Sequence, residues 1–182
     1  MKDLTVSRRR AALLVIDIQD RLAPAMPAAQ LELMIRNTKI AIAAARRFAL
    51  PIVVSEQYPK GLGRTIAPIE EALAESGAHR FEKTTFSACA GDFAMHGRDQ
   101  WIVAGMETHV CVWQSVRDLR ARGASVHLLT DAVSSRTPEN RQVGLDLARA
   151  AGAVLSSTET VVFDLLGAAG SDDFKALSKL IK

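Results

Sequence analysis

The chain has 182 residues, of which 48% are hydrophobic, 24% charged and only 5% aromatic, and it contains two cysteines. This composition is typical of a globular protein and excludes collagen-like, disordered and disulfide-stapled chains. No apolar run approaches the ~20 residues that a membrane helix needs, and the polar start of the chain has no apolar signal core. We therefore expect a single domain over residues 1–182, soluble and cytoplasmic, with no membrane partner.

The charge pattern gives little reason to expect a nucleic-acid partner. Lysine and arginine together number 23 against 20 acidic residues, which leaves a net charge of +3. The basic run Arg8 to Arg10 has no aromatic residues interleaved with it. A surface that follows a phosphate backbone usually carries a denser basic stripe, so we expect no nucleic-acid binding.

Short apolar runs recur along the chain and predict buried strands. Their hydrophobicity is continuous rather than alternating, which is typical of a sheet covered on both faces. In chain order, the expected strands are 11–16, 51–54, 79–82, 101–104, 126–129 and 153–155.

Helical patterns lie between these runs. Apolar positions recur at three- and four-residue steps from Leu31 to Ala49 and again from Val112 to Leu119. Thr137 followed by Pro138 predicts a capped helix start, and Gly152 predicts its end. The alternation predicts a three-layer α/β/α sandwich, Rossmann-like, with a mostly parallel sheet and ligands bound beyond the carboxyl ends of the strands.

Three residues near these strand ends are candidates for chemistry. Asp17 ends an apolar strand, where burial is costly unless the carboxylate is paired, although a helix cap or a loop carboxylate is the alternative. Lys83 follows the third run, and a lone lysine is nearly always a surface group. Cys111 falls in the first turn of a helix if Thr108 is the N-cap, which would favour a thiolate; a small buried hydrophobe is an equally good interpretation. Cys89 lacks such a setting, and we interpret it as structural.

The three residues together carry a family resemblance. V-I-D-I-Q-D around Asp17, F-E-K-T-T-F-S around Lys83 and G-M-E-T-H-V-C-V around Cys111 resemble, in order and spacing, the Asp-Lys-Cys triad motifs of the isochorismatase-like cysteine hydrolases. The stretch S-E-Q-Y-P-K-G-L-G-R-T at 55–65 and D-A-V-S-S-R at 131–136 resemble the branch called isochorismatase domain-containing proteins.

The resemblance implies a role for each residue of the triad. Cys111 would attack an amide-like or related acyl carbon, Asp17 would act as general base, and Lys83 would keep Asp17 ionised and favour the thiolate. It also implies a cis peptide bond between Met106 and Glu107, with the N–H groups of Glu107 and Cys111 forming an oxyanion hole. Gln19, Tyr58, Leu62 and Phe86 are the expected substrate-binding residues.

Departures from better-known members narrow the expected chemistry. The nicotinamidase metal ligands are absent, because the corresponding place reads Ser55-Glu56-Gln57-Tyr58, so we expect no metal and no cofactor. True isochorismatases lack the cysteine, so Cys111 favours nucleophilic hydrolysis. A homo-oligomer is implied by the resemblance, with the 58–65 loop as a lid or intersubunit arm. The alternative function is a small-molecule-binding or regulatory protein that keeps the triad without turnover; a dinucleotide-dependent oxidoreductase is disfavoured because the glycine fingerprint is missing.

Overall fold

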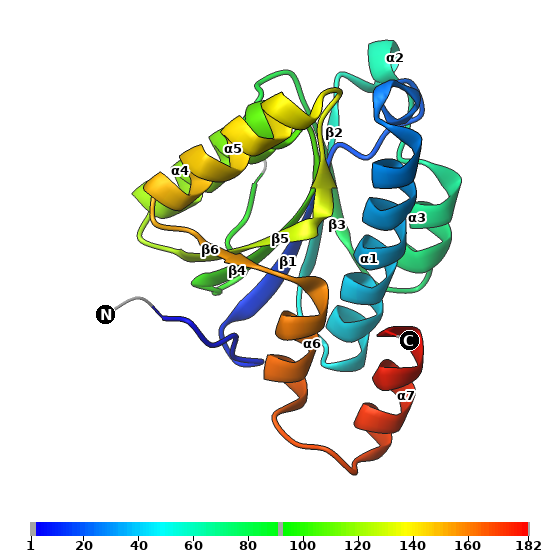
Figure 1. Cartoon of the computed structure of the whole chain (residues 1–182), viewed down its shortest axis with the longest axis vertical. Coiled ribbons are helices and arrows are strands. Elements are labelled where there is room, and N and C mark those ends of the chain that lie inside the picture. The colour runs from blue at the N-terminus through cyan, green and yellow to red at the C-terminus, as the bar shows by residue number, and fades with distance from the viewer. Residues whose placement is uncertain (1–2, 91–92, 182) are drawn as a thin grey trace.

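A six-stranded sheet forms the middle layer of the computed structural model, which describes residues 3–90 and 93–181 (Figure 1). Its strand order is β3-β2-β1-β4-β5-β6, and every neighbouring pair is parallel. The strands are β1 (Ala11–Ile16), β2 (Ile52–Gln57), β3 (His79–Lys83), β4 (Gln100–Met106), β5 (Ser125–Ser134) and β6 (Val154–Ser156).

Helices cover both faces of this sheet, as the alternating pattern predicts (Figure 1). One face carries α4 (Trp113–Ala121), preceded by the π-helical turn η2 (Thr108–Val112), and α5 (Pro138–Ala150). The other carries α1 (Ala28–Arg47), α3 (Ala67–Leu73), α6 (Thr158–Leu166) and α7 (Asp172–Ile181). Two short elements, η1 (Ala23–Ala25) and α2 (Pro59–Leu62), lie in the connections that follow β1 and β2. The three-layer architecture is therefore confirmed.

The alternation of side chains along β1 builds two separate cores. Leu13 and Val15 pack into the apolar cluster beneath α1, whereas Leu14 and Ile16 pack into the cluster beneath α4 and α5. All six residues of β1 are buried. Because successive side chains of a strand point to opposite faces, a strand covered on both sides needs apolar residues at every position. The continuous apolar run at 11–16 therefore predicted β1 with the bounds that the structure shows.

Other boundaries differ from the sequence expectation. The strands β2, β4 and β5 extend two to five residues beyond the carboxyl ends of the apolar runs, because the residues there continue the sheet pairing. Helix α5 begins as predicted, with the Thr137 hydroxyl accepting a hydrogen bond from the Asn140 N–H at 3.2 Å. The helices α3, α6 and α7 were not predicted.

The strand order places a topological switch point between β1 and β4. The chain leaves β1 to build β2 and β3 on one side, and later returns to build β4, β5 and β6 on the other. In open α/β sheets, ligands bind outside the carboxyl ends of the strands at such a point. Asp17 follows β1 directly, and η2 with Cys111 follows β4, so both candidates flank the switch point.

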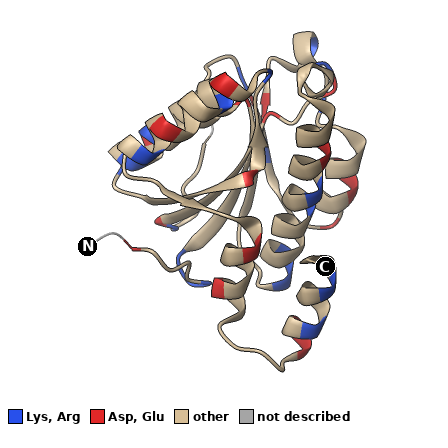
Figure 2. Cartoon of the chain, in the orientation of Figure 1, with Lys and Arg blue, Asp and Glu red and all other residues tan. Residues whose placement is uncertain are grey.

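Charged residues lie mainly on the helices and connecting segments (Figure 2). None of the helices within the described ranges is long and apolar enough to cross a membrane. The extent of the domain, which we expect to be the whole chain, stays a prediction.

Candidate active site

Asp17 is buried and has hydrogen-bond partners on both of its carboxylate oxygens. The residue adopts a left-handed backbone conformation (φ 51°) directly after β1, and its side chain is 0% exposed. Its Oδ1 accepts a hydrogen bond from Ser55 Oγ at 2.7 Å, and its Oδ2 accepts one from Lys83 Nζ at 2.6 Å. Burial raises the pKa of Asp17 above its ordinary value, although Lys83 and the Ser55 hydroxyl act in the opposite direction. The helix-cap alternative is therefore excluded.

Lys83 is a buried ammonium rather than the surface group that a lone lysine usually is. It is the last residue of β3, and its residue exposure is 7%. Besides Asp17, its Nζ donates to Gln57 Oε1 at 2.7 Å and to the backbone oxygens of Phe86 at 3.1 Å and Thr85 at 3.3 Å. The position across β2 from Asp17 follows from the sheet order, since Gln57 and Lys83 are paired in register.

Cys111 joins this pair from the other side of the switch point. It lies in η2 and is 6% exposed, and its thiol interacts electrostatically with both Asp17 and Lys83. The structure thus brings together the three side chains that the motifs singled out. The peptide bond between Met106 and Glu107, four residues upstream, is cis as expected.

Of the two interpretations of Cys111, the structure does not support a resting thiolate. Burial and the nearby Asp17 charge together raise the pKa of the thiol to about 12, although Lys83 partly opposes them. The predicted Thr108 cap is also absent, because the N-cap is Glu107 and the Thr108 hydroxyl donates to Ser134 O instead. Burial also raises the pKa of Cys89, to about 11, so thiol acidity does not separate the two cysteines. What separates them is the buried Asp17 and Lys83 pair beside Cys111.

Two glycines allow the site segments to approach closely, and sequence reasoning missed both. A Cβ at Gly105 on β4 would lie 2.1 Å from the backbone oxygen of Ile16, the residue before Asp17, and the φ of Gly105 is +126°. A Cβ at Gly144 on α5 would lie 2.6 Å from the Thr108 backbone in η2. Since only glycine lacks a Cβ, these positions set the separation of β1 from β4 and of α5 from η2. Glycine inside a strand or helix pattern was the signal for close backbone approach.

Further side-chain bonds fix the backbone around η2. Glu107 is buried, and its Oε2 accepts hydrogen bonds from the N–H and the Nε of Arg136, both at 3.0 Å. The ring Nδ1 of His109 is hydrogen-bonded to Ser135 Oγ at 3.1 Å. The loop after β5 therefore holds the residues that flank Cys111.

Gln19 ties the 58–65 loop to the segment after β1. Its buried side-chain amide donates to Gly63 O at 2.7 Å and Gln57 O at 3.0 Å, and it accepts from the Gln57 N–H at 2.7 Å. Glu56 holds the end of the same loop, because its Oε1 accepts from both the N–H and the hydroxyl of Thr65. Direct contact of Gln19 with a substrate stays a prediction, and the contacts described here give it a structural role.

Tyr58 and Phe86 lie at the surface beside the buried pair. They are 52% and 54% exposed, and Leu62 is half-buried. A hollow of about 340 Å³ has Tyr58 and Lys83 among its lining residues. The backbone carbonyl of Phe86 contacts the site directly, because it accepts a hydrogen bond from Lys83 Nζ. Substrate contact by these three residues stays a prediction.

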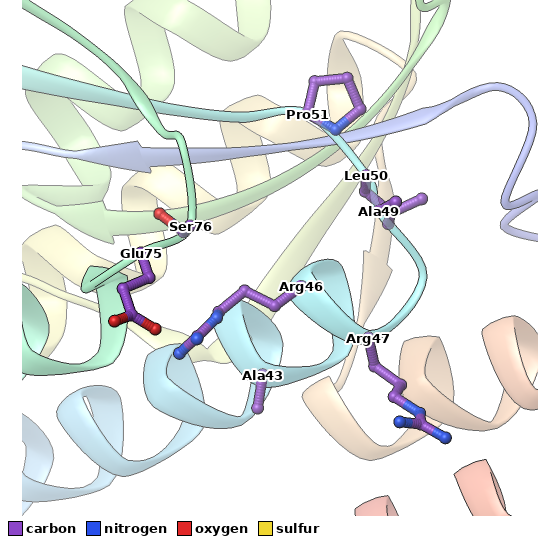
Figure 3. A pocket seen from close by; sticks show the side chains of 8 residues that line it. All are labelled: Ala43, Arg46, Arg47, Ala49, Leu50, Pro51, Glu75 and Ser76. Carbon is purple, nitrogen blue, oxygen red and sulfur yellow. The ribbon is translucent and has the colours of Figure 1, made fainter.

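A larger hollow lies at the opposite edge of the sheet, around the residues that precede β2 and β3 (Figure 3). Its volume is about 730 Å³, and its charged lining residues are Arg46, Arg47 and Glu75. None of the site candidates lines it. Within the described parts of the chain, no group of three or more His, Cys, Asp or Glu side chains is arranged to hold a metal ion.

Comparison with known proteins identifies relatives over most of the chain. The isochorismatase domain matches residues 11–160. The secreted isochorismatase effector Isc1 of Phytophthora sojae (strain P6497) is 38% identical over 160 residues, covering 84% of this chain and 76% of that protein. Isochorismatase domain-containing protein 2 of Bos taurus is 38% identical over 142 residues, covering 76% and 68%. The solved structure of the MAR1 ribonuclease from Caenorhabditis elegans superposes with a TM-score of 0.91 at 36% identity, covering 97% of this chain and 92% of that one.

Proposed function

This chain belongs to the isochorismatase domain family, and we propose that it is a cofactor-free cysteine hydrolase acting on a small amide-like or related acyl substrate. The observation that carries the proposal is the buried pair of Asp17 and Lys83 beside the thiol of Cys111. Taking a carboxylate and an ammonium out of water is costly, and catalytic sites are where such groups gather.

The neutral thiol assigns the general-base role to Asp17. Because burial raises the pKa of Asp17, its carboxylate is a stronger base than an exposed aspartate. It takes the Cys111 proton as the sulfur attacks the acyl carbon, so that an S–C bond forms and negative charge develops on the acyl oxygen. The oxyanion collapses, the C–N bond breaks, and the amine leaves with the proton that Asp17 holds.

Hydrolysis of the resulting thioester restores the enzyme. Asp17 takes a proton from water as the water oxygen attacks the same carbon. The S–C bond then breaks, the carboxylic acid leaves, and the proton returns from Asp17 to the sulfur of Cys111. The net reaction consumes one water for each bond cleaved and needs no redox partner.

Lys83 acts as a fixed charge in this scheme rather than as a proton donor. Its Nζ is directed at four oxygen acceptors, one on Asp17, one on Gln57 and two on the backbone. An ammonium has only three protons, so these bonds occupy its donors. Its positive charge offsets the negative charge that passes from Asp17 to the sulfur during attack.

The remaining residues complete the proposed site. The N–H groups of Glu107 and Cys111 serve as the oxyanion hole, where one donor is worth about 10²- to 10³-fold in rate. Tyr58, Leu62 and Phe86 are the proposed substrate contacts at the rim, and Gln19 holds the loop that carries two of them. Cytoplasmic localisation and a homo-oligomer remain part of the proposal, although the Phytophthora relative is named as secreted.

The test measures turnover and a covalent adduct with three proteins: wild type, Cys111→Ala and the matched control Cys89→Ala. The panel contains amides, ureas and esters, with isochorismate and an RNA oligonucleotide added because relatives are named for them. We expect hydrolysis of an amide or ester by wild type and Cys89→Ala, a loss of about 10³-fold or more in Cys111→Ala, and an acyl adduct on Cys111 by mass spectrometry. Equal, near-zero rates in all three proteins with retained ligand binding would support a binding protein instead.

A further inference from the structure

Ser55 contacts Asp17 at two points. The N–H of Asp17 donates to the Ser55 backbone oxygen at 3.1 Å, and the Ser55 hydroxyl donates to Asp17 Oδ1 at 2.7 Å. The two contacts follow from the sheet register, in which Ile16 lies opposite Ser55. A serine on β2 therefore holds both the backbone and the carboxylate of the residue that follows β1.

Because Ser55 and Asp17 are buried, the hydrogen bond between them contributes to keeping the Asp17 carboxylate charged. Ser55 and Asp17 are both 0% exposed. A buried carboxylate is stabilised in its charged form only by the hydrogen bonds and charges that the protein supplies. Lys83 bonds to Oδ2, and Ser55 bonds to Oδ1, so each oxygen has its own donor.

The groups around Asp17 differ in whether they titrate. The titratable groups that act on it most strongly are Lys83 from β3 and Cys111 from η2, and the latter shares the proton transfer itself. The Ser55 hydroxyl does not titrate in the working pH range. It is thus a constant donor to the charged carboxylate, unlike the thiol opposite.

We infer that Ser55 is a positioning residue that holds the Asp17 carboxylate ionised and oriented for proton transfer from Cys111. The inference rests on the proposed function, because it assigns a role within the same proton transfer. Without the hydroxyl, Asp17 loses a hydrogen bond to its charged form. The carboxyl then keeps its proton to higher pH, where it is unable to act as a base.

The test follows the alkylation of Cys111 by iodoacetamide as a function of pH, which needs no substrate. Peptide mass spectrometry separates Cys111 from Cys89. On the acid side, the wild-type rate falls as Asp17 becomes protonated. We expect Ser55→Ala to move that midpoint upward by about 0.5–1 pH unit, the effect of one lost hydrogen bond, and Ser55→Thr, which keeps the hydroxyl, to restore the wild-type midpoint.

Thr38→Val is the matched control, because it also removes a buried hydroxyl. Thr38 lies on α1, is 0% exposed, and its hydroxyl has no hydrogen-bond partner within the described residues. We expect its midpoint to equal that of wild type. An unchanged midpoint in folded Ser55→Ala, verified by circular dichroism, overturns the inference, as does an equal shift in Ser55→Thr. A merely structural Ser55 would lower thermal stability without moving the midpoint.

Asp17→Asn separates this inference from the proposed function. If Asp17 is the base, the acid-side midpoint disappears in Asp17→Asn, and the rate rises steadily with pH up to the ionisation of the thiol. A midpoint that survives in Asp17→Asn contradicts the proposed base. A midpoint that disappears there but is unmoved in Ser55→Ala contradicts only the role of Ser55.

Discussion

One ion pair at the carboxyl edge of the sheet is buried, whereas an ion pair at the amino edge is partly exposed to water. At the carboxyl edge, the side chains of Asp17 and Lys83 are 0% and 3% exposed and bond to each other at 2.6 Å. At the amino edge, the side chains of Arg47 and its partner Asp173 are 49% and 29% exposed. The larger hollow is nevertheless at the amino edge (Figure 3).

A buried charge is therefore a better indicator of a chemical site than the size of a hollow. An exposed ion pair is worth about 0–1 kcal/mol, because water solvates both partners. A buried pair carries a desolvation penalty of several kcal/mol per ion, which its attraction and hydrogen bonds must offset.

The largest effect is expected from adding a methyl group at a glycine of each edge. In Gly105→Ala, the new Cβ overlaps the Ile16 backbone next to Asp17, in a backbone conformation that L side chains rarely adopt. In Gly77→Ala, at the amino edge, no atom lies within 4 Å of the new Cβ, and only the φ of +65° is unfavourable. We expect losses in the free energy of unfolding of about 5 kcal/mol or more for Gly105→Ala and about 1–2 kcal/mol for Gly77→Ala. Urea unfolding measures both, and equal losses would contradict the close approach of β4 to β1.

A second test removes one partner of an ion pair at each edge. Lys83→Met leaves Asp17 buried without its counter-charge, and we expect a loss of about 3–5 kcal/mol in the free energy of unfolding. Arg47→Met breaks an exposed pair and is expected to cost about 1 kcal/mol or less. The double variant Asp17→Asn with Lys83→Met should regain part of the stability, because no unpaired charge remains. If Lys83→Met costs no more than Arg47→Met, the buried pair is not the distinguishing feature of the carboxyl edge.

The smallest effect concerns the pH dependence of the 58–65 loop. Burial alone would raise the pKa of Glu56, but hydrogen bonds from Arg64 and Thr65 outweigh burial and lower that pKa below its ordinary value of 4.5. A carboxylate with a lowered pKa in the folded state stabilises the loop above the unfolded pKa, and this stabilisation is lost as the pH falls through the folded value. We therefore expect the loop to loosen reversibly below pH 4.5.

Tyr58 provides the probe for this loosening, because it is the chain's one tyrosine. A fluorotyrosine label gives a single ¹⁹F resonance, whose position should change as the pH falls through the titration of Glu56. In Glu56→Gln, which cannot titrate, we expect the pH-dependent change to disappear. A wild-type resonance that is constant down to the onset of global unfolding would show that Glu56 does not hold the loop.

Local sequence patterns were enough to predict the layered architecture, since continuous apolar runs separated by helical periodicity leave few other ways to bury both faces of each strand. It also pointed to Asp17, Lys83 and Cys111, through local motifs at or after strand ends. The helices α3, α6 and α7 were not predicted, although α6 and α7 are at least as long as α4, which was.

The electrostatics of the site, in contrast, depend on contacts between residues that are far apart in the sequence. The sequence places Cys111 in a helical turn and a lysine elsewhere, which suggested a thiolate, but the acidity of a thiol depends on its burial and on every charge that reaches it. The hydroxyl of Ser55 on Asp17, the amide of Gln57 on Lys83 and the close approach at Gly105 join residues that are 26 to 89 positions apart along the chain. Such contacts depend on strand order and register, which no local pattern encodes.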